Sequence, residues 1–168
     1  MTTGGSGVAA YLNGLGGAEL AAALRRCCAS EPWVAGMARR APFEDDADVH
    51  AAATETWWAL EPAGWREAFA AHPRIGAREI EDRRARSEQS GVDGASGEVL
   101  AALASGNVAY EERFGFIFLI CASGLGAGEM LAALETRLEN APGIELRVAA
   151  EEQAKITRLR LDRLGGGA

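Results

Sequence analysis

The sequence has 168 residues, of which 48% are hydrophobic and 24% are charged, and its formal net charge at pH 7 is −7. A chain of this length can bury a sizeable core in one domain, since a domain of about 150 residues hides roughly two-thirds of its unfolded surface. The acidic balance argues against nucleic acid or an anionic membrane surface as a partner, because both require clustered positive charge.

The first seventeen residues contain neither a basic segment nor an adequate hydrophobic one, so they do not resemble a signal peptide. We expect residues 1–17 to be flexible. The longest apolar stretch, FGFIFLICASGLGAG, is interrupted by glycines and is shorter than the ~20 residues that cross a bilayer. Cys27 and Cys28 are adjacent and Cys121 stands apart, which is a poor disulfide framework. These features predict a soluble, cytoplasmic protein with reduced thiols.

Three helices are predicted in the first half of the chain, where apolar residues recur at helical intervals. The first covers residues 19–28, and Pro32 blocks its continuation. The second lies within residues 43–61, where several aspartates suit a helix N-terminus, and it ends before Pro62. The third follows Pro62 and runs to the sequence HPRIG, at residues 72–76, where a turn is expected.

A longer helix is predicted between residues 96 and 114, because one face carries a stripe at steps of three and four residues. The stripe consists of Leu100, Leu103, Asn107, Tyr110 and Phe114. Asn107 is the polar exception. We expect its amide to be satisfied within a buried helix contact or to face a bound water.

The remaining chain is also predicted to be helical. FIFLICA, at residues 116–122, is apolar on every side and indicates a central helix, with a strand as the alternative. Further helices are predicted within residues 126–143 and 145–164. No two-residue alternation with hairpin turns and no internal repeat is present. The sequence therefore predicts an all-α, single-domain bundle of about seven to nine helices over residues 18–164, with an unstructured tail at 165–168.

His72, one of two histidines in the chain, stands at the start of HPRIG. The following Pro73 disfavours α-helical backbone for the residue before it, which holds His72 outside the preceding helix. Because histidine titrates near neutral pH, a restrained histidine at a helix end is a candidate proton carrier. A capping or surface role is the alternative. His50 lies within a predicted helix and has no comparable signal.

Glu88 and Gln89 lie at the end of a charged, predicted helix, beside Gly91. A solvated helix C-terminus is one interpretation. An acidic side chain is unfavourable at this end of a helix dipole, however, which suggests a role in binding. A carboxylate can accept two N–H hydrogen bonds from a urea group, and Gln89 supplies both a donor and an acceptor.

Five segments together resemble the OHCU decarboxylases in order and spacing, over roughly residues 57–164: HPRIG, SEQSGV, YEERFGFIFLICASG, EMLAALETRLEN and EEQAKITRLRL. The resemblance implies an all-helical, homodimeric enzyme of urate degradation. It would decarboxylate the ureide 2-oxo-4-hydroxy-4-carboxy-5-ureidoimidazoline (OHCU) to (S)-allantoin. No cofactor and no metal are implied, because the substrate carries its carboxylate beside a C=N bond that accepts the electrons released with CO2.

The resemblance also implies the site residues. His72 and Glu88 correspond to the catalytic pair, with His72 in proton transfer, and Glu88 and Gln89 would hold the ureido group. The other implied substrate contacts are Pro73, Ala85, Ser87, Phe118, Leu119, Ile120, Cys121, Ala122 and Arg160, with Arg158 as the alternative arginine. In the 118–122 segment, and near Gly115, the contacts are backbone amides that bind ring oxygens.

This chain departs from the family pattern at two positions. It has Ala85 where many relatives carry serine, and Ser123 where some carry arginine. Two alternatives to the decarboxylase are a catalytically silent helical interaction module and an enzyme that acts on a neighbouring ureide such as 5-hydroxyisourate.

Overall fold

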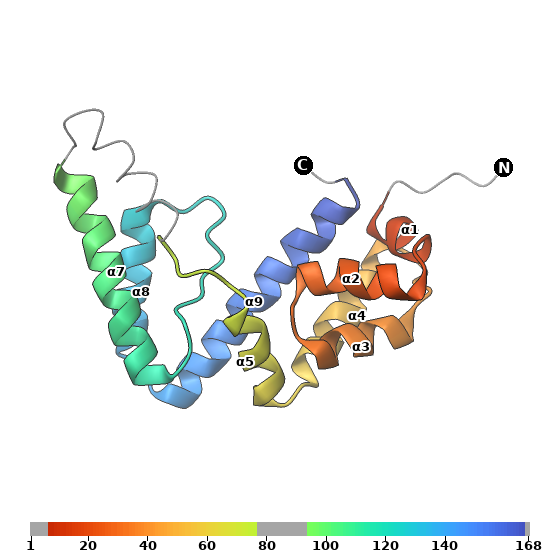
Figure 1. Ribbon diagram of the computed structural model, residues 1–168, viewed down its shortest axis with the longest axis horizontal. Helices are drawn as coiled ribbons and strands as arrows, with labels where there is room; N and C mark the ends of the chain where they lie inside the picture. Colours follow the sequence, from red (N-terminus) through yellow and green to blue (C-terminus); the bar gives the residue numbers. More distant parts are fainter. Residues whose placement is uncertain (1–6, 77–93, 167–168) are drawn as a thin grey trace. The chain divides into compact units, whose positions relative to one another are not determined.

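The computed structural model describes residues 7–76 and 94–166, and in these ranges all regular secondary structure is α-helical (Figure 1). The helices are α1 (Val8–Asn13), α2 (Gly17–Cys27), α3 (Glu31–Arg40), α4 (Asp46–Trp58), α5 (Pro62–Ala70), α7 (Gly94–Phe114), α8 (Ala127–Leu138) and α9 (Pro142–Leu164). The predicted all-α class is confirmed. The eight helices of the described ranges also agree with the expected number.

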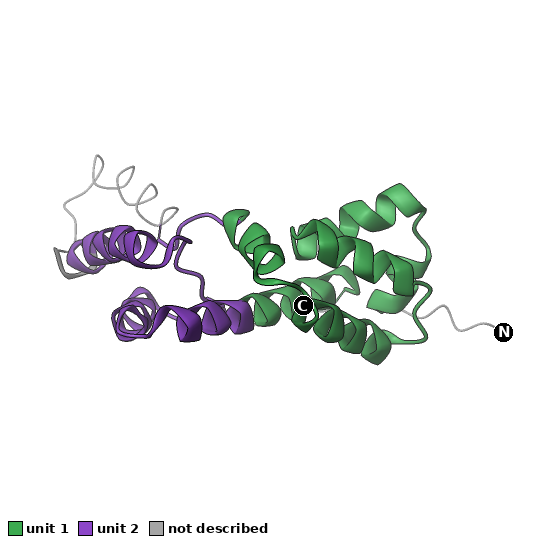
Figure 2. Cartoon of the chain, turned by 90° about the horizontal axis from the view of Figure 1, so that it is seen from below, with its two compact units in different colours: residues 1–71, 153–168 green, residues 72–152 purple. Residues whose placement is uncertain are grey.

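Contacts between Cα atoms divide the chain into two compact units (Figure 2). Unit 1 contains residues 1–71 and 153–168, and unit 2 contains residues 72–152. Helix α9 supplies residues to both units. The domain bounds 18–164 stay a prediction. Within the described ranges, no helix combines the length and the apolar character that a membrane span requires.

The helix starts of unit 1 follow from local sequence signals. The Asp45 side chain accepts a hydrogen bond of 2.8 Å from the Asp48 N–H and caps α4, and the further aspartates of its first turn favour the positive end of the helix dipole. Pro62 begins α5, where a proline costs no hydrogen bond. Pro32 acts in the same way at the start of α3, a helix that the periodicity did not predict.

The prediction of a flexible segment over residues 1–17 is wrong for its described part, because Val8–Asn13 forms α1 and Leu12 is completely buried. Tertiary hydrogen bonds hold this helix. The Ala9 N–H donates to Asp46 at 2.9 Å, and the Asn13 amide bonds both the N–H and the carbonyl of Phe43. A helix this short is not stable alone, so its own sequence carries little signal. In the predicted tail, the Gly165 N–H still bonds the Leu161 carbonyl.

Unit 2 is built on α7 and α8, which lie side by side (Figure 1). They approach closely at Gly106, where an added Cβ would lie 2.5 Å from a methyl group of Leu134. Glycine at this position therefore permits the two helices to pack. The core of the unit includes the fully buried side chains of Leu103, Tyr110 and Phe118.

The segment between α7 and α8 corrects a prediction, because residues 115–126 form neither the expected helix nor the alternative strand. Gly115 ends α7 with φ of +79°, a left-handed conformation that favours glycine. Phe116, Phe118, Leu119 and Ile120 are nevertheless buried. The apolar composition of FIFLICA thus reflects burial, while side chains from other helices bond its backbone.

Candidate functional site

The described part of the predicted site consists of the His72 turn, the 118–122 segment and the arginines of α9. Ala85, Ser87, Glu88 and Gln89 lie outside the described residues. His72 and residues 118–122 belong to unit 2, whereas Arg158 and Arg160 belong to unit 1.

The His72 turn, residues 72–76, lies immediately after α5 and is half-exposed at His72, so the prediction that Pro73 keeps this histidine outside the helix is confirmed. Two side chains of α7 bind the turn. Asn107 donates from Nδ2 to the carbonyl of Ile75 at 2.8 Å. Glu111 pairs with Arg74 through two contacts of 3.1 Å.

The 118–122 segment is attached to α8 and α9 by two side chains. Arg137 donates to the Leu119 carbonyl at 2.7 Å, and Glu152 accepts from the Cys121 N–H at 2.8 Å. Among the described residues, the N–H groups of the buried Phe118 and Ile120 and of the exposed Ala122 have no hydrogen-bond partner. A buried N–H group normally has one. The donors of Phe118 and Ile120 are therefore suited to bind the oxygen atoms of a ligand.

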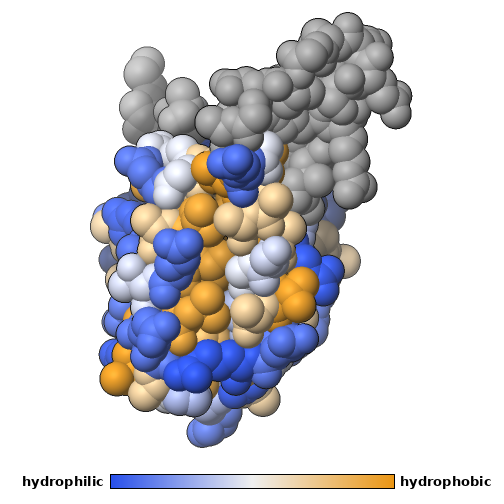
Figure 3. Space-filling model, turned by 90° about the vertical axis from the view of Figure 1, so that its left-hand side faces the viewer, coloured by the Kyte–Doolittle hydropathy of each residue, from blue (hydrophilic) through white to orange (hydrophobic). Residues whose placement is uncertain are grey.

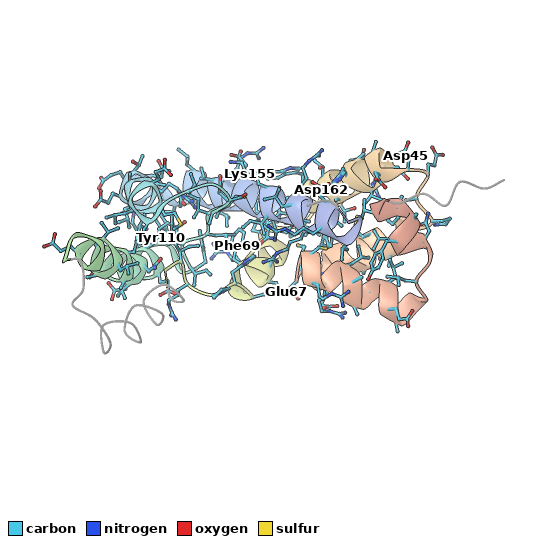
Figure 4. The ribbon with its side chains drawn as sticks, turned by 90° about the horizontal axis from the view of Figure 1, so that it is seen from above. Asp45, Glu67, Phe69, Tyr110, Lys155 and Asp162 are labelled. Atoms are coloured by element: carbon cyan, nitrogen blue, oxygen red, sulfur yellow. The ribbon has the colours of Figure 1, made fainter. Side chains whose placement is uncertain are left out.

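A buried polar network lies beneath this segment. The Arg137 side chain is 9% exposed and that of Glu145 is 0% exposed, and the two form an ion pair at 2.6 Å. Tyr110, labelled in Figure 4, donates its hydroxyl to the same Glu145 oxygen. Asn140 donates to the other oxygen at 2.9 Å, and the Arg137 guanidinium lies 4.6 Å from the centre of the Phe118 ring. The network thus satisfies a buried carboxylate and fixes the backbone at Leu119.

Tyr110 is protonated in this network. Burial, reinforced by the hydrogen bond to Glu145, raises the pKa of Tyr110 well above its ordinary value. The phenol therefore remains a donor throughout the physiological pH range. Because Asn107 and Tyr110 both belong to α7, this one helix holds the His72 turn and also takes part in holding the 118–122 segment.

The arginines of α9 occupy different environments within unit 1. Arg160 is directed to the end of α2, with Nη1 3.5 Å and 3.4 Å from the carbonyl oxygens of Arg26 and Cys27. Arg158 lines a pocket of about 200 Å³ together with His50 and Trp57. His50 lies in α4 as expected and pairs with Asp162 at 2.8 Å.

The three cysteines are free, and two of them are buried in unit 1. Burial raises the pKa of Cys27 to about 11 and that of Cys28 to about 12, so both are thiols at neutral pH and poor nucleophiles. Over residues 7–76 and 94–166, no three His, Cys, Asp or Glu side chains are arranged to hold a metal ion.

The sequence prediction missed Arg137, Glu145 and Glu152, which position the backbone of the 118–122 segment. One signal was available. Arg137 follows Leu134 by three residues, on the apolar face of the predicted helix over residues 126–143, where an arginine requires a buried partner. The partner Glu145 could not be identified from spacing, because a chain turn separates α8 from α9.

Comparison with known proteins gives one family. Residues 13–162 match the family model described as OHCU decarboxylase. The chain is 41% identical over 145 residues to the "Uric acid degradation bifunctional protein TTL" of Arabidopsis thaliana, which covers 82% of this chain and 45% of the plant protein. It is 34% identical over 126 residues to the 2-oxo-4-hydroxy-4-carboxy-5-ureidoimidazoline decarboxylase of Amia calva, covering 71% of this chain and 72% of that protein.

A solved structure agrees with these matches. The crystal structure described as OHCU decarboxylase in the presence of (S)-allantoin superposes with a TM-score of 0.71 at 39% identity, covering 84% of this chain and 96% of that one. The present chain spans less than half the length of the plant relative, whose name describes two functions.

Proposed function

The chain belongs to the OHCU decarboxylase family, and we propose that it converts OHCU to (S)-allantoin and CO2 without a cofactor. The observation that carries this proposal is the arrangement on α7 in unit 2. A histidine outside any helix and a backbone segment with unpartnered N–H groups are both held by this helix. Such an arrangement provides a proton carrier and donors for developing negative charge.

The chemistry requires few groups from the protein. The bond between the ring carbon C4 and the carboxylate breaks, CO2 leaves, and the electron pair forms a C4=C5 double bond. The former C5=N electrons move to nitrogen, which takes up a proton. The C4 hydroxyl then loses its proton as C4=O forms, and C5 receives a proton on one face. The substrate therefore serves as its own electron sink, and the protein must orient it and transfer protons.

The residues divide these tasks in the proposal. His72 carries the proton between the C4 hydroxyl and C5. Glu88 and Gln89 hold the ureido group, and the N–H groups of the 118–122 segment bind a ring oxygen, where negative charge develops. Arg160 meets the carboxylate, with Arg158 as the alternative. Ala85 supplies no hydroxyl at the position where many relatives carry serine.

The experiment that tests the function uses freshly generated OHCU and follows product formation by circular dichroism. OHCU also decays without an enzyme, so the chirality of the product is the informative signal. We expect optically active (S)-allantoin with the wild-type protein and racemic product, formed at the spontaneous rate, with heat-denatured protein. Racemic product from the folded wild-type protein would exclude the proposed function.

We also propose a homodimer in the cytoplasm. The family resemblance supports the dimer. Hydrophobic side chains reach the surface on one face of the molecule (Figure 3), and among the residues of unit 2, Val108 and Ile144 are exposed by 53% and 59%. The three free cysteines agree with a reducing compartment. Sedimentation equilibrium should give twice the chain mass of 17.6 kDa, and a monomer at micromolar concentration would contradict the dimer.

A further inference from the structure

Asn107 occupies a position that its neighbours suggest should be apolar. It lies on the buried stripe of α7 between Leu103 and Tyr110, and it is only 3% exposed. Its Nδ2 donates to the carbonyl of Ile75 at 2.8 Å, which fixes the orientation of the amide because a carbonyl oxygen accepts and does not donate. Its Oδ1 is buried and has no hydrogen-bond partner among residues 7–76 and 94–166.

This half-satisfied amide is a poor device for stabilising a fold. A buried acceptor without a partner opposes folding, and an apolar side chain of similar size fills such a position without that cost. Asn13 provides the contrast within the same chain. Its amide bonds both the carbonyl and the N–H of Phe43, at 2.8 Å and 2.9 Å. A contribution to folding stability explains why Asn13 is an asparagine, but it does not explain the asparagine at position 107.

The partner of Asn107 indicates what the amide does. Ile75 lies three residues after His72, and the flanking contacts bind the same turn. One turn of α7 earlier, Leu103 lies beneath Gly76, where an added Cβ would be 3.6 Å from its methyl group. One turn later, Glu111 pairs with Arg74. Positions 103, 107 and 111 share one face of the helix and follow the turn backwards toward His72.

Asn107 is the central and most protected of these contacts. The Arg74 side chain is largely exposed, and exposed ion pairs contribute little because water and salt screen them. Leu103 supplies packing without direction. The hydrogen bond from Asn107 is directional and its donor is buried. Pro73, whose ring fixes its φ angle, connects His72 to the rest of this turn.

We propose that Asn107 is a positioning residue for proton transfer: through the Ile75 carbonyl it fixes the turn so that the His72 imidazole meets the substrate in one orientation. This inference rests on the proposed function. Small displacements of a proton carrier reduce the chemical step strongly, whereas substrate binding by other residues is unaffected. Loss of the orientation of His72 should therefore lower kcat and leave KM nearly unchanged.

The test compares Asn107→Leu with the matched variant Asn13→Leu. For Asn107→Leu we expect a Tm close to that of the wild type, because removal of the unpartnered Oδ1 offsets the loss of the donor to the Ile75 carbonyl. We also expect a loss of at least about tenfold in kcat and a KM within about threefold. For Asn13→Leu we expect a lower Tm with kcat of the folded protein unchanged. A lower Tm for Asn107→Leu with unchanged kcat, or its failure to fold, would overturn the proposal, because the amide would then serve stability.

Asn107→Asp adds a test that conserves shape. Its carboxyl group can donate to the Ile75 carbonyl only while protonated. We expect kcat of this variant to fall with increasing pH more steeply than that of the wild type, as the carboxyl group ionises. Parallel pH profiles for the two proteins would contradict the role of the donor.

A readout without substrate separates this inference from the proposed function. The chain has two histidines, so its imidazole Cε1–H region in an NMR spectrum contains two signals, and His72→Asn assigns them. We expect the His72 signal to be single in the wild type and broadened or split in Asn107→Leu, while the His50 signal is unchanged. An unchanged His72 signal would overturn the positioning role. If the wild-type protein did not turn over OHCU, this result would contradict the proposed function but not the positioning role of Asn107.

Discussion

Replacement of Arg137 by methionine tests the buried network that holds the 118–122 segment. Arg137→Met keeps the aliphatic stem of the side chain but removes the guanidinium group, and with it the positive charge and the contact with the Phe118 ring. The Glu145 carboxylate, which is 0% exposed, then keeps its hydrogen bonds from Tyr110 and Asn140 without a compensating cation. The Leu119 carbonyl also loses its donor.

The expected loss of stability is large. Breaking a buried ion pair by removing one partner typically costs about 3–5 kcal/mol. For a chain of this size, each kcal/mol lowers the Tm by about 2–4 °C, so the melting temperature should fall by about 6–20 °C. Thermal unfolding followed by far-ultraviolet circular dichroism measures this directly.

Two further variants separate the buried charge from a general effect of losing an arginine. Arg147→Met removes one partner of an exposed pair with Glu151, whose atoms are 3.7 Å apart, and should cost less than about 1 kcal/mol. The double variant Arg137→Met with Glu145→Gln should recover part of the lost Tm, because the uncompensated charge is gone. Equal melting temperatures for Arg137→Met and Arg147→Met would refute the reasoning.

Other predictions concern the reaction and its pH range. His72→Asn should fold normally and lose about 10²–10⁴-fold in kcat, and full activity in a steady-state assay would show that the imidazole is structural. Glu88→Gln should lose most of kcat/KM without a change in Tm, and an unchanged kcat/KM would remove Glu88 from the site. Activity should survive exhaustive chelation and dialysis; recovery of lost activity by an added metal would contradict the cofactor-free reaction. Because burial raises the pKa of Cys27 and Cys28 in the folded state, folded protein retains protons that the unfolded chain releases, so Tm should fall as the pH rises from about 9 to about 11, and a constant Tm would contradict this.

The sequence was sufficient for the elements whose signals are local. The aspartates at the start of α4, Pro62 at the start of α5 and the apolar stripe of α7 each act within one helix, and these helices were predicted close to their observed bounds. Their physical causes, which are capping, proline geometry and one-sided burial, are present in the residues themselves.

The failures have a common origin in tertiary contacts. Helix α1 forms because Asp46 and Phe43 bond it, and residues 115–126 stay irregular because Arg137 and Glu152 bond their backbone. Neither interaction is visible as a periodicity. The prediction for Asn107 is partly correct: the side chain is buried, but its Nδ2 bonds the His72 turn and not another helix, and among the described residues its Oδ1 has no partner.

The site also combines features that follow from local sequence signals with features that depend on tertiary contacts. Pro73 is enough to hold His72 outside the helix, and the structure confirms this consequence. The side chains that position the turn and the 118–122 segment come from α7, α8 and α9, so they became apparent only when the helices were placed together.

The central claim is that this chain uses His72 to decarboxylate OHCU. The most direct measurement is a side-by-side determination of kcat/KM for wild type and His72→Asn on freshly generated OHCU and on 5-hydroxyisourate. We predict that wild type consumes OHCU well above the spontaneous rate and forms (S)-allantoin, that His72→Asn loses at least about 10²-fold, and that neither protein accelerates the loss of 5-hydroxyisourate. Turnover of 5-hydroxyisourate alone, or decay of both compounds at their spontaneous rates in the presence of folded wild type, would contradict the claim.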